Sequence, residues 1–252
     1  MELSSEIDYI TIENQEVDFP RHFHETFCIS LIKRGIEQIE FGTHSILSES
    51  GTISITNPYE VHANPVVNSD LKTSFDTIYI SKDVMKYFVG NNIILNTQIN
   101  EGKVLREFLS LRNSLAKNNP KINETHLTAF IDAIHPFSKP KNESGEMMDL
   151  TNLQFIEKFI DFHIKERFTV NQLAQLASLN KFGFIKKFKS YTGLSPMNYV
   201  IMKKVFSAKS LITKDINLSE LAYDYNFTDL AHFSKTFKRY IGISPSKYKL
   251  NL

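Results

Sequence analysis

The sequence of 252 residues contains a single cysteine, Cys28, and no apolar run near the roughly 20 residues that a membrane-spanning helix needs. One cysteine excludes an internal disulfide and favours a reducing compartment. The first ten residues, MELSSEIDYI, lack the basic stretch and apolar segment of a signal peptide. These absences predict a cytoplasmic protein that does not act in a membrane. The length suffices for two domains, and 42% hydrophobic with 23% charged residues is a globular composition.

The net charge of +1 conceals an asymmetry between the two halves of the chain. Residues 1–138 carry a net charge of −7, whereas residues 151–252 carry +9. This difference indicates that only the C-terminal half binds a polyanion.

The last hundred residues contain one pattern twice. LAQLASLNKFGFIKKFKSYTGLSPMNY begins at Leu173, and LAYDYNFTDLAHFSKTFKRYIGISPSKY begins at Leu221. Such self-similarity indicates a duplicated structural unit. Each copy predicts a helix, a short turn and a basic helix, which is the pattern of a helix-turn-helix that binds DNA.

Local patterns place the helices of this half. We expect second helices over 181–191 and 229–240, each preceded by a first helix that opens with a capping box at Thr169 or Asn217. An earlier helix is expected over 151–165. A connecting helix over 196–212 would be about 26 Å long, which suits two DNA-reading helices about 34 Å, one turn of DNA, apart.

The first half predicts a different architecture. Short runs of β-branched and aromatic residues, separated by turn residues, predict strands over 27–32, 36–41 and 52–56 and favour a small barrel or sandwich. Helical spacing follows over 81–89, 101–117 and 123–135. The stretch 136–148 is poor in apolar residues and contains two prolines. The sequence therefore predicts a sensing and dimerisation domain over 1–137, a linker over 138–150 and a DNA-binding domain over 151–252.

On these residues, the C-terminal half resembles the AraC/XylS transcription regulators over about residues 151–252. The resemblance rests on Phe-x-Lys-x-Phe-Lys followed by Gly-x-Ser-Pro-x-x-Tyr, which is present in both copies. It implies contacts to base edges by one set of side chains, namely Phe182, Ile185, Lys186, Ala231, His232 and Lys235. Lys189, Lys238 and Arg239 are expected on phosphates, because long cations there position a protein without reading sequence.

Two departures from the family pattern affect these expectations. Ser178 and Asn226 occupy turn positions where the family usually has glycine, and serine tolerates a left-handed backbone less well than asparagine. We therefore expect the first turn to be the looser one. Lys186 and Lys235 replace the usual arginines, which removes the bidentate fork that recognises guanine. This predicts an A·T-leaning site with shape readout.

The histidines of the first half resemble a cupin pattern. His22-x-His24 precedes a strand, and Pro58-x-x-x-His62 follows a later one. Imidazoles in this arrangement can bind zinc, iron or nickel. A metal cupin also needs a carboxylate soon after His-x-His, and residues 26–31 contain none. We therefore predict no bound metal and no other cofactor. Instead we predict an effector pocket lined by His22, His24, His62 and Tyr79, with an empty scaffold as the alternative.

Together these features predict a two-domain α+β protein. A cupin-like β-barrel with following helices would precede an all-α domain in which a long helix joins two helix-turn-helix motifs. The predicted function is a sequence-specific regulator of transcription, more often an activator in this family, which binds double-stranded DNA and would then engage RNA polymerase. The helices at 101–135 either form a homodimer interface, which we favour, or pack on their own barrel. The alternatives are a metal-dependent cupin enzyme tethered to DNA and a regulator controlled by a protein partner. We expect no catalytic residues.

Overall fold

The computed structural model describes residues 7–67, 72–117, 120–141 and 151–251. Two compact units divide the chain, one of residues 1–18 and 23–144 and the other of residues 19–22 and 145–252. Strand β2 (Phe19–His22) is hydrogen-bonded into a sheet of the first unit, so it is described there. Within the described ranges, no helix has the length and apolar character that crossing a bilayer requires.

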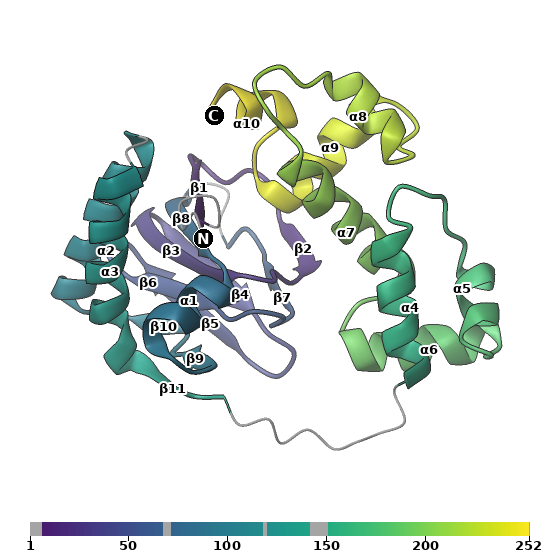
Figure 1. The fold of residues 1–252 in the computed structure, drawn as a ribbon, viewed down its shortest axis with the longest axis horizontal. Coiled ribbons are helices and arrows are strands. Elements are labelled where there is room, and N and C mark those ends of the chain that lie inside the picture. Colours follow the sequence, from purple (N-terminus) through teal and green to yellow (C-terminus); the bar gives the residue numbers. More distant parts are fainter. Residues whose placement is uncertain (1–6, 68–71, 118–119, 142–150, 252) are drawn as a thin grey trace. The chain divides into compact units, whose positions relative to one another are not determined.

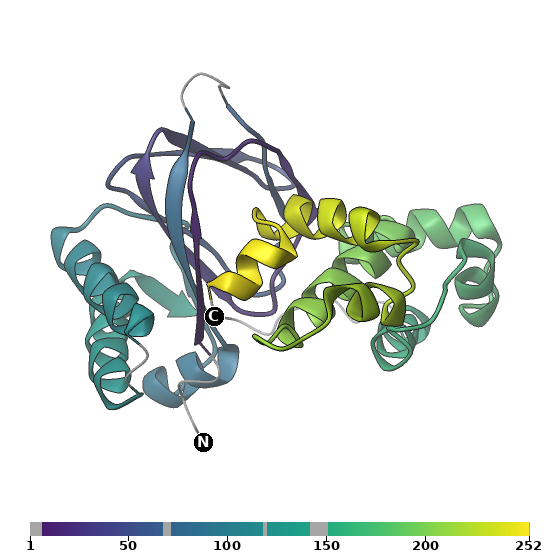
Figure 2. The ribbon, with the colours of Figure 1, turned by 90° about the horizontal axis from the view of Figure 1, so that it is seen from above.

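The first unit consists of strands followed by helices (Figures 1 and 2). One sheet has the strand order β1-β8-β3-β6-β10, a second has the order β2-β7-β4-β5, and β11 pairs with β9. The remaining strands are β1 (Ile7–Ile12), β3 (Phe27–Arg34), β4 (Ile36–Glu40), β5 (Ser45–Glu49), β6 (Ile53–Thr56), β7 (His62–Asn64), β8 (Ser74–Ile80), β9 (Ile93–Leu95), β10 (Gln98–Ile99) and β11 (Ser138–Pro140). The helices are α1 (Lys82–Val89), α2 (Gly102–Ala116), α3 (Pro120–Ile134) and the short 3-10 helix η2 (His135–Phe137).

Two expectations for this unit need correction. The described strands pair in separate sheets and do not close into the single ring of a barrel. The linker was predicted to begin at residue 138, but Ser138–Pro140 pairs antiparallel with β9, and the Lys141 amide donates to the Asn92 carbonyl at 3.0 Å. Proline suggested a linker here, but a strand at the edge of a sheet tolerates proline, because no neighbouring strand requires the missing amide hydrogen. Composition alone therefore did not predict strand β11. Residues 142–150 of the predicted linker lie outside the described residues.

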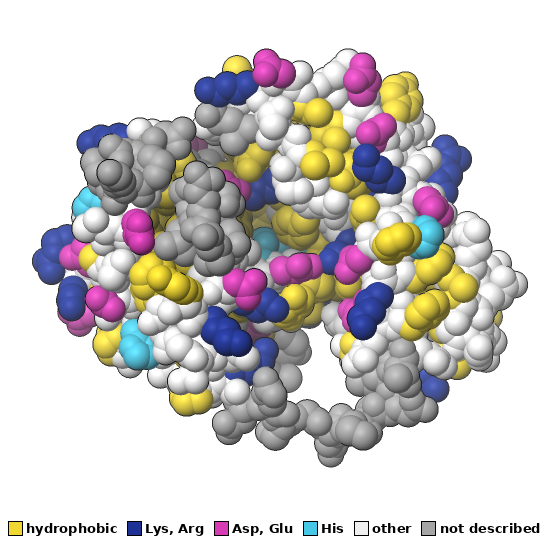
Figure 3. Space-filling view, in the orientation of Figure 1, with side chains coloured by type: hydrophobic (Ala, Val, Ile, Leu, Met, Phe, Trp, Pro, Cys, Tyr) yellow, Lys and Arg dark blue, Asp and Glu magenta, His cyan; other side chains and the backbone are white. Residues whose placement is uncertain are grey.

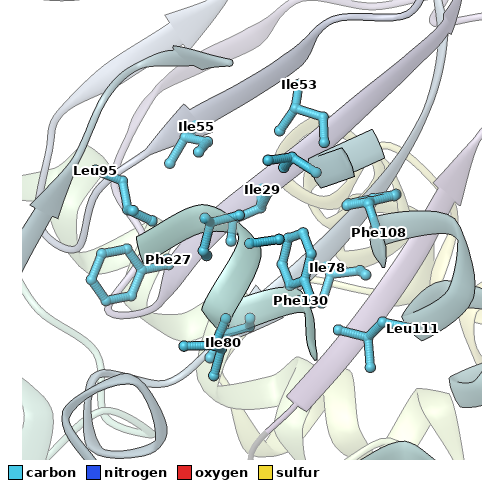
Figure 4. Packing of buried hydrophobic residues seen from close by; sticks show 14 of the residues in the cluster. Phe27, Ile29, Ile53, Ile55, Ile78, Ile80, Leu95, Phe108, Leu111 and Phe130 are labelled. Carbon is cyan, nitrogen blue, oxygen red and sulfur yellow. The ribbon is translucent and has the colours of Figure 1, made fainter. Parts of the chain in front are cut away.

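One face of the five-stranded sheet is apolar and forms the core of the unit. The antiparallel register places Ile29 beside both Ile55 and Ile78, and all three are fully buried. Helices α2 and α3 cover this face, with the rings of Phe108 and Phe130 in an edge contact at 5.8 Å (Figure 4). The apolar stripe over 101–135 therefore packs on its own sheet. This packing removes the reason for which a dimer interface was favoured there.

The second unit is helical. In Figure 1, α7 runs between a group formed by α4, α5 and α6 and a group formed by α8, α9 and α10. Their bounds are α4 (Thr151–Phe162), α5 (Val170–Leu176), α6 (Lys181–Thr192), α7 (Pro196–Ser210), α8 (Leu218–Asp224), α9 (Leu230–Ile241) and α10 (Pro245–Leu250). The predicted helices all form, although α4 and α7 end two or three residues early. Helix α10 was not predicted, although Ser244 and Pro245 mark its start as cap and first residue.

Candidate DNA-binding and effector sites

The first helix-turn-helix consists of α5, a turn and α6. Thr169 caps α5 in a reciprocal capping box with Gln172, as predicted. Asn180 caps α6, where its side-chain oxygen accepts from the Gly183 amide at 2.8 Å. Phe184 and Phe188 are fully buried, four residues apart. One face of α6 is thus fixed in the core, and the opposite face is available to a partner.

The second helix-turn-helix, α8 and α9, repeats this frame. Asn217 accepts from the backbone of the first turn of α8, and its side-chain amide donates to Glu220 at 2.9 Å. Asp229 caps α9 by accepting from the His232 amide at 2.7 Å. Phe233 and Phe237 are fully buried, as their counterparts in α6 are. The two copies of the repeated sequence therefore bury equivalent phenylalanines.

The two turns have the same backbone conformation. Ser178 has φ +55° and Asn226 has φ +56°. In each turn the following residue donates its amide to a carbonyl five positions earlier, at 2.9 Å for Leu179 and 3.0 Å for Phe227. The backbone conformation therefore does not distinguish the two turns. The Ser178 amide also donates to the Gln175 carbonyl at 2.9 Å, so backbone hydrogen bonds accompany the left-handed conformation of this serine.

The residues expected to contact DNA all lie on α6 or α9. Phe182 is 80% exposed, an unusual degree of exposure for a phenylalanine. Seven of the nine are exposed, namely Phe182, Lys186, Lys189, Ala231, His232, Lys235 and Arg239, while Ile185 and Lys238 are half-buried. On each of the two helices, these residues thus lie on the side opposite the two buried phenylalanines.

A buried lysine ties the two helix-turn-helix units to the helix between them. The ammonium of Lys204, in α7, donates to the carbonyl of Glu166 at 2.7 Å and to that of Tyr225 at 2.8 Å. Glu166 precedes the first helix-turn-helix motif, and Tyr225 lies in the turn of the second motif. Burial lowers the pKa of Lys204 to about 8, so the ammonium still predominates at pH 7. This role was not predicted from the sequence, because lysine in a helix usually indicates an exposed position.

A second set of bonds joins the same two segments. Arg167 donates to the side-chain oxygen of Asn226 at 3.1 Å, and the Asn226 amide donates to the Lys165 carbonyl. Lys165 also forms an ion pair with Asp224 at 3.3 Å. Together with Lys204, these contacts join the segment before α5 to the turn before α9.

In the first unit, the face of the five-stranded sheet opposite the core is polar. Ser30 pairs in register with Ser54 and with Thr77, and the Ser30 and Thr77 hydroxyls are 2.7 Å apart. Thr56 Oγ1 is buried and makes no hydrogen bond to any described residue. Buried hydroxyls are normally satisfied, so this atom marks a position where a water molecule or a ligand group would bind.

A buried carboxyl group lies between the two larger sheets. Glu37, on β4, accepts from the Ser54 hydroxyl of the opposite sheet and from the Asn64 amide of β7 at 3.1 Å. It is only 3% exposed, and burial raises its pKa to about 7. Glu37 was not among the predicted site residues, although serine and threonine on the inward positions of β6 were a visible signal.

The structure brings the four predicted effector residues together. The His24 ring lies 5.4 Å from that of His62 and 5.3 Å from that of Tyr79, between ring centres. One ligand nitrogen from each of His22, His24 and His62 lies within 4.8 Å of the others. The histidines are buried and Tyr79 is half-buried. Glu25 is exposed, as its position next to His24 in an extended segment predicts.

The three histidines fit a transition metal. His22 Nδ1 contacts the Pro20 carbonyl at 2.6 Å, and His62 Nδ1 contacts the Glu60 carbonyl at 2.8 Å. A carbonyl only accepts, so both Nδ1 atoms donate and each Nε2 carries the lone pair that a metal needs. Tetrahedral zinc would hold its nitrogens about 3.4 Å apart, which small side-chain shifts achieve. Three imidazoles also suffice for some zinc sites, so the missing carboxylate does not exclude a metal.

Two family models match the chain. A model described as an AraC-like ligand binding domain matches residues 5–131, and one described as a helix-turn-helix domain matches residues 173–251. YbfI of Bacillus subtilis, an uncharacterized transcriptional regulator, is 22% identical over 227 residues, covering 85% of this chain and 81% of the relative. The transcriptional activator RhaS of Escherichia coli is 20% identical over 244 residues, covering 91% and 87%. LumQ of Photobacterium leiognathi, a probable transcriptional regulator, is 33% identical over 99 residues, which cover 39% of this chain and 40% of LumQ.

Solved structures with the same fold include ToxT of Vibrio cholerae. An apo ToxT variant aligns with a TM-score of 0.62 at 13% identity, covering 98% of this chain and 97% of that one. Wild-type ToxT bound to an unsaturated fatty acid aligns with a TM-score of 0.57 at 13% identity, covering 98% and 95%. The arrangement of a sheet-rich unit before two helix-turn-helix motifs is therefore shared with these proteins.

Proposed function

Because the chain belongs to the AraC family of transcription regulators, we propose that α6 and α9 enter two successive major grooves on one face of a DNA duplex. One observation carries this proposal. Helices α6 and α9 each bury two equivalent phenylalanines and present the residues expected to contact DNA on the other side. Phe182, Ile185 and Lys186 contact base edges in one groove, and Ala231, His232 and Lys235 contact them in the other. Lys189, Lys238 and Arg239 neutralise phosphates.

The preferred site leans towards A·T base pairs, because lysine lacks the two-pronged contact with which arginine selects guanine. Selection of bound sequences from a random DNA library with the full-length protein tests this proposal. A G·C-rich core under both recognition helices contradicts the A·T preference, and protection of one groove alone contradicts the docking.

We propose further that the first unit binds a small-molecule effector between its two larger sheets, at His22, His24, His62 and Tyr79. Two observations support this site: the Thr56 hydroxyl, which has no partner among the described residues, and the buried Glu37 carboxyl both face the same polar interior. ToxT has been solved with an unsaturated fatty acid bound, which supports a small molecule as the class of ligand. Native mass spectrometry of the purified full chain tests the proposal. A regulator controlled only by a protein partner would show no bound small molecule under any growth condition.

A metal ion held by His22, His24 and His62 is a second candidate for this interior, because the nitrogen positions and backbone carbonyls fit one. Metal analysis of the purified protein separates the two candidates. Stoichiometric zinc, iron or nickel that is lost in His62→Gln favours the metal, whereas absence of metal favours the organic effector. We propose that the protein is not an enzyme in either case, consistent with relatives that are regulators.

We propose that the protein acts in the cytoplasm as a homodimer and activates transcription through contact with RNA polymerase. RhaS, which aligns over most of this chain, is a transcriptional activator. Size-exclusion chromatography with light scattering tests the homodimer, and transcription in vitro from a selected site tests the sign of regulation. A monomer at micromolar concentration, or repression, overturns the corresponding part of the proposal.

A further inference from the structure

A second pocket lies in the first unit, apart from the polar interior described above. Its volume is about 300 Å³, near the lower end for small-molecule sites. Its walls come from the segment 57–59, helix α1 and the residues 91–94, and it reaches Lys141. We call it the lysine pocket, because three lysines line it: Lys82, Lys86 and Lys141.

The charge in this pocket has one sign. None of its lining residues is acidic, and no ion pair joins Lys82, Lys86 or Lys141 to any described residue. All three lysines are exposed. In the space-filling view, dark-blue side chains gather over α1 and β9 (Figure 3). Three like charges around one concave surface raise the local concentration of anions.

Part of the remaining lining is apolar, and the Asn57 side chain is already hydrogen-bonded. Met85 and Ile93 are buried, and each exposes an apolar edge to the pocket. The Asn57 side chain is committed to the frame, since its oxygen accepts from the Leu95 amide at 2.8 Å and its amide donates to the Leu95 carbonyl at 3.1 Å. The pocket therefore combines a rigid, partly apolar floor with a cationic rim.

Tyr59 stands at the edge of this pocket in a strained conformation. Its φ is +66°, which is a genuine outlier for a bulky side chain, and such strain concentrates at ligand sites. The Tyr59 amide donates to the His24 carbonyl at 2.8 Å, which holds the turn. The Lys82 ammonium lies 4.6 Å from the centre of the Tyr59 ring. The strain thus keeps an aromatic face next to the cationic rim.

We propose that the lysine pocket binds a small organic anion, with its phosphate or carboxylate group on the lysines and its apolar part against Met85 and Ile93. Lysine suits this role as a compact point charge. Lys141 directly follows strand β11, which ends at Pro140. An anion in this pocket would therefore bind at a place apart from the polar interior.

Calorimetric titration of the full chain at constant ionic strength tests the proposal with three probes: phenyl phosphate, phenylacetate and the uncharged benzyl alcohol. We expect saturable binding of at least one aryl anion with a Kd of about 1 mM or tighter, and none of benzyl alcohol. Binding of phenyl phosphate alone assigns the phosphate class, and binding of phenylacetate alone assigns the carboxylate class. If neither anion binds saturably, or if benzyl alcohol binds equally well, the proposal is overturned.

Charge-reversal variants locate the site. Lys82→Glu combined with Lys86→Glu should weaken binding at least about tenfold, because it replaces attraction by repulsion at both ends of one helix face. Lys141→Glu, which changes no helix, should also weaken binding. The control Lys103→Glu makes the same charge change as Lys141→Glu, on an exposed residue of α2, and should leave the affinity unchanged. Equal losses in the control and the pocket variants overturn the assignment. An effector in the polar interior would still bind the pocket variants.

Discussion

The two helix-turn-helix motifs bury the same phenylalanines and differ at several of their exposed positions. Phe184 and Phe188 correspond to Phe233 and Phe237, and all four are fully buried. On the outer surface Phe182, 80% exposed, corresponds to Ala231. The two copies therefore keep the same buried phenylalanines and differ at several exposed positions, whereas Lys186 and Lys235 are the same residue at equivalent exposed positions.

The difference has a consequence for the site on DNA. His232 corresponds to Gly183 and Ser234 to Ile185, so one recognition surface is more apolar and the other more polar. An apolar side chain contacts the thymine methyl group, whereas an imidazole exchanges hydrogen bonds with base edges. If both helices contact base edges as proposed, a single chain is expected to read two unlike half-sequences, which would give its complete site a direction.

The largest effect is expected from the buried frames. Phe184→Ala and Phe233→Ala should each lower the free energy of unfolding by about 3–5 kcal/mol, because each removes a fully buried ring and leaves a cavity. Urea unfolding of the full chain, followed by far-ultraviolet circular dichroism, measures the loss. Amide hydrogen exchange assigns it to one unit or the other.

Phe182→Ala is the matched control in the same helix. It should change the free energy of unfolding by less than about 0.5 kcal/mol, because the ring is exposed. A large loss of stability in this variant, or a small one in Phe233→Ala, would break the division between buried frame and exposed surface.

The next largest effect concerns the connection between the two helix-turn-helix motifs. Lys204→Met should cost about 2–4 kcal/mol of stability, because it leaves the carbonyls of Glu166 and Tyr225 without their charged donor. It should also weaken binding to the full DNA site more than binding to either half-site. Equilibrium binding to full and half-sites measures this difference.

Lys203→Met provides the comparison. Lys203 is the neighbouring residue, and it pairs with Asp161 at 2.9 Å on the partly exposed side of the unit. Its replacement should cost no more than about 1 kcal/mol. If Lys204→Met weakens binding to half-sites and the full site equally, the two recognition helices are not held by this residue.

The sequence allowed prediction of the helical unit because its determinants are local. Apolar spacing, the caps at Thr169 and Asn217 and the repeated turns all act within a few residues. Lys204 escaped prediction because its partners lie 38 and 21 positions away, at Glu166 and Tyr225. The exposed positions of α6 and α9 could be inferred, because they lie on the face opposite the buried phenylalanines.

The sheet-rich unit was predictable only in part. The strands at 27–32, 36–41 and 52–56 follow from composition, but their partners do not, because pairing joins distant segments. The polar interior depends on Glu37 meeting Ser54 and Asn64, 17 and 27 positions away. The histidine pattern nevertheless indicated a cluster, and His22, His24 and His62 do lie close together.

Smaller effects are expected at the residues that read DNA. Lys186→Ala and Lys235→Ala should each weaken specific binding by about 1–3 kcal/mol and relax the sequence preference in one half-site only. Lys189→Ala should instead weaken binding to all sequences and reduce the dependence of affinity on salt. Selection from a random DNA library with each variant distinguishes these outcomes. Relaxation of both half-sites by one substitution would mean that the helices do not read separately.

The smallest effect concerns the caps of the two recognition helices. Asn180 and Asp229 accept from equivalent backbone amides, at 2.8 Å from Gly183 and 2.7 Å from His232. Replacement of either by alanine should cost about 1 kcal/mol of stability, and exchange of one cap type for the other should cost much less. Amide hydrogen exchange of the first turns of α6 and α9 measures both changes.

The exchange separates capping from DNA binding. Asp229→Asn removes a negative charge at the end of α9 that approaches the duplex, so it should strengthen binding at low salt while stability hardly changes. Asn180→Asp adds a negative charge at the start of α6, so it should weaken binding by the first helix-turn-helix motif for the same Coulombic reason. The two effects should fade together as salt is raised, because both are Coulombic. If Asp229→Asn weakens binding at low salt, the Asp229 carboxylate contacts DNA favourably, and the two units differ in their caps as well as in their outer faces.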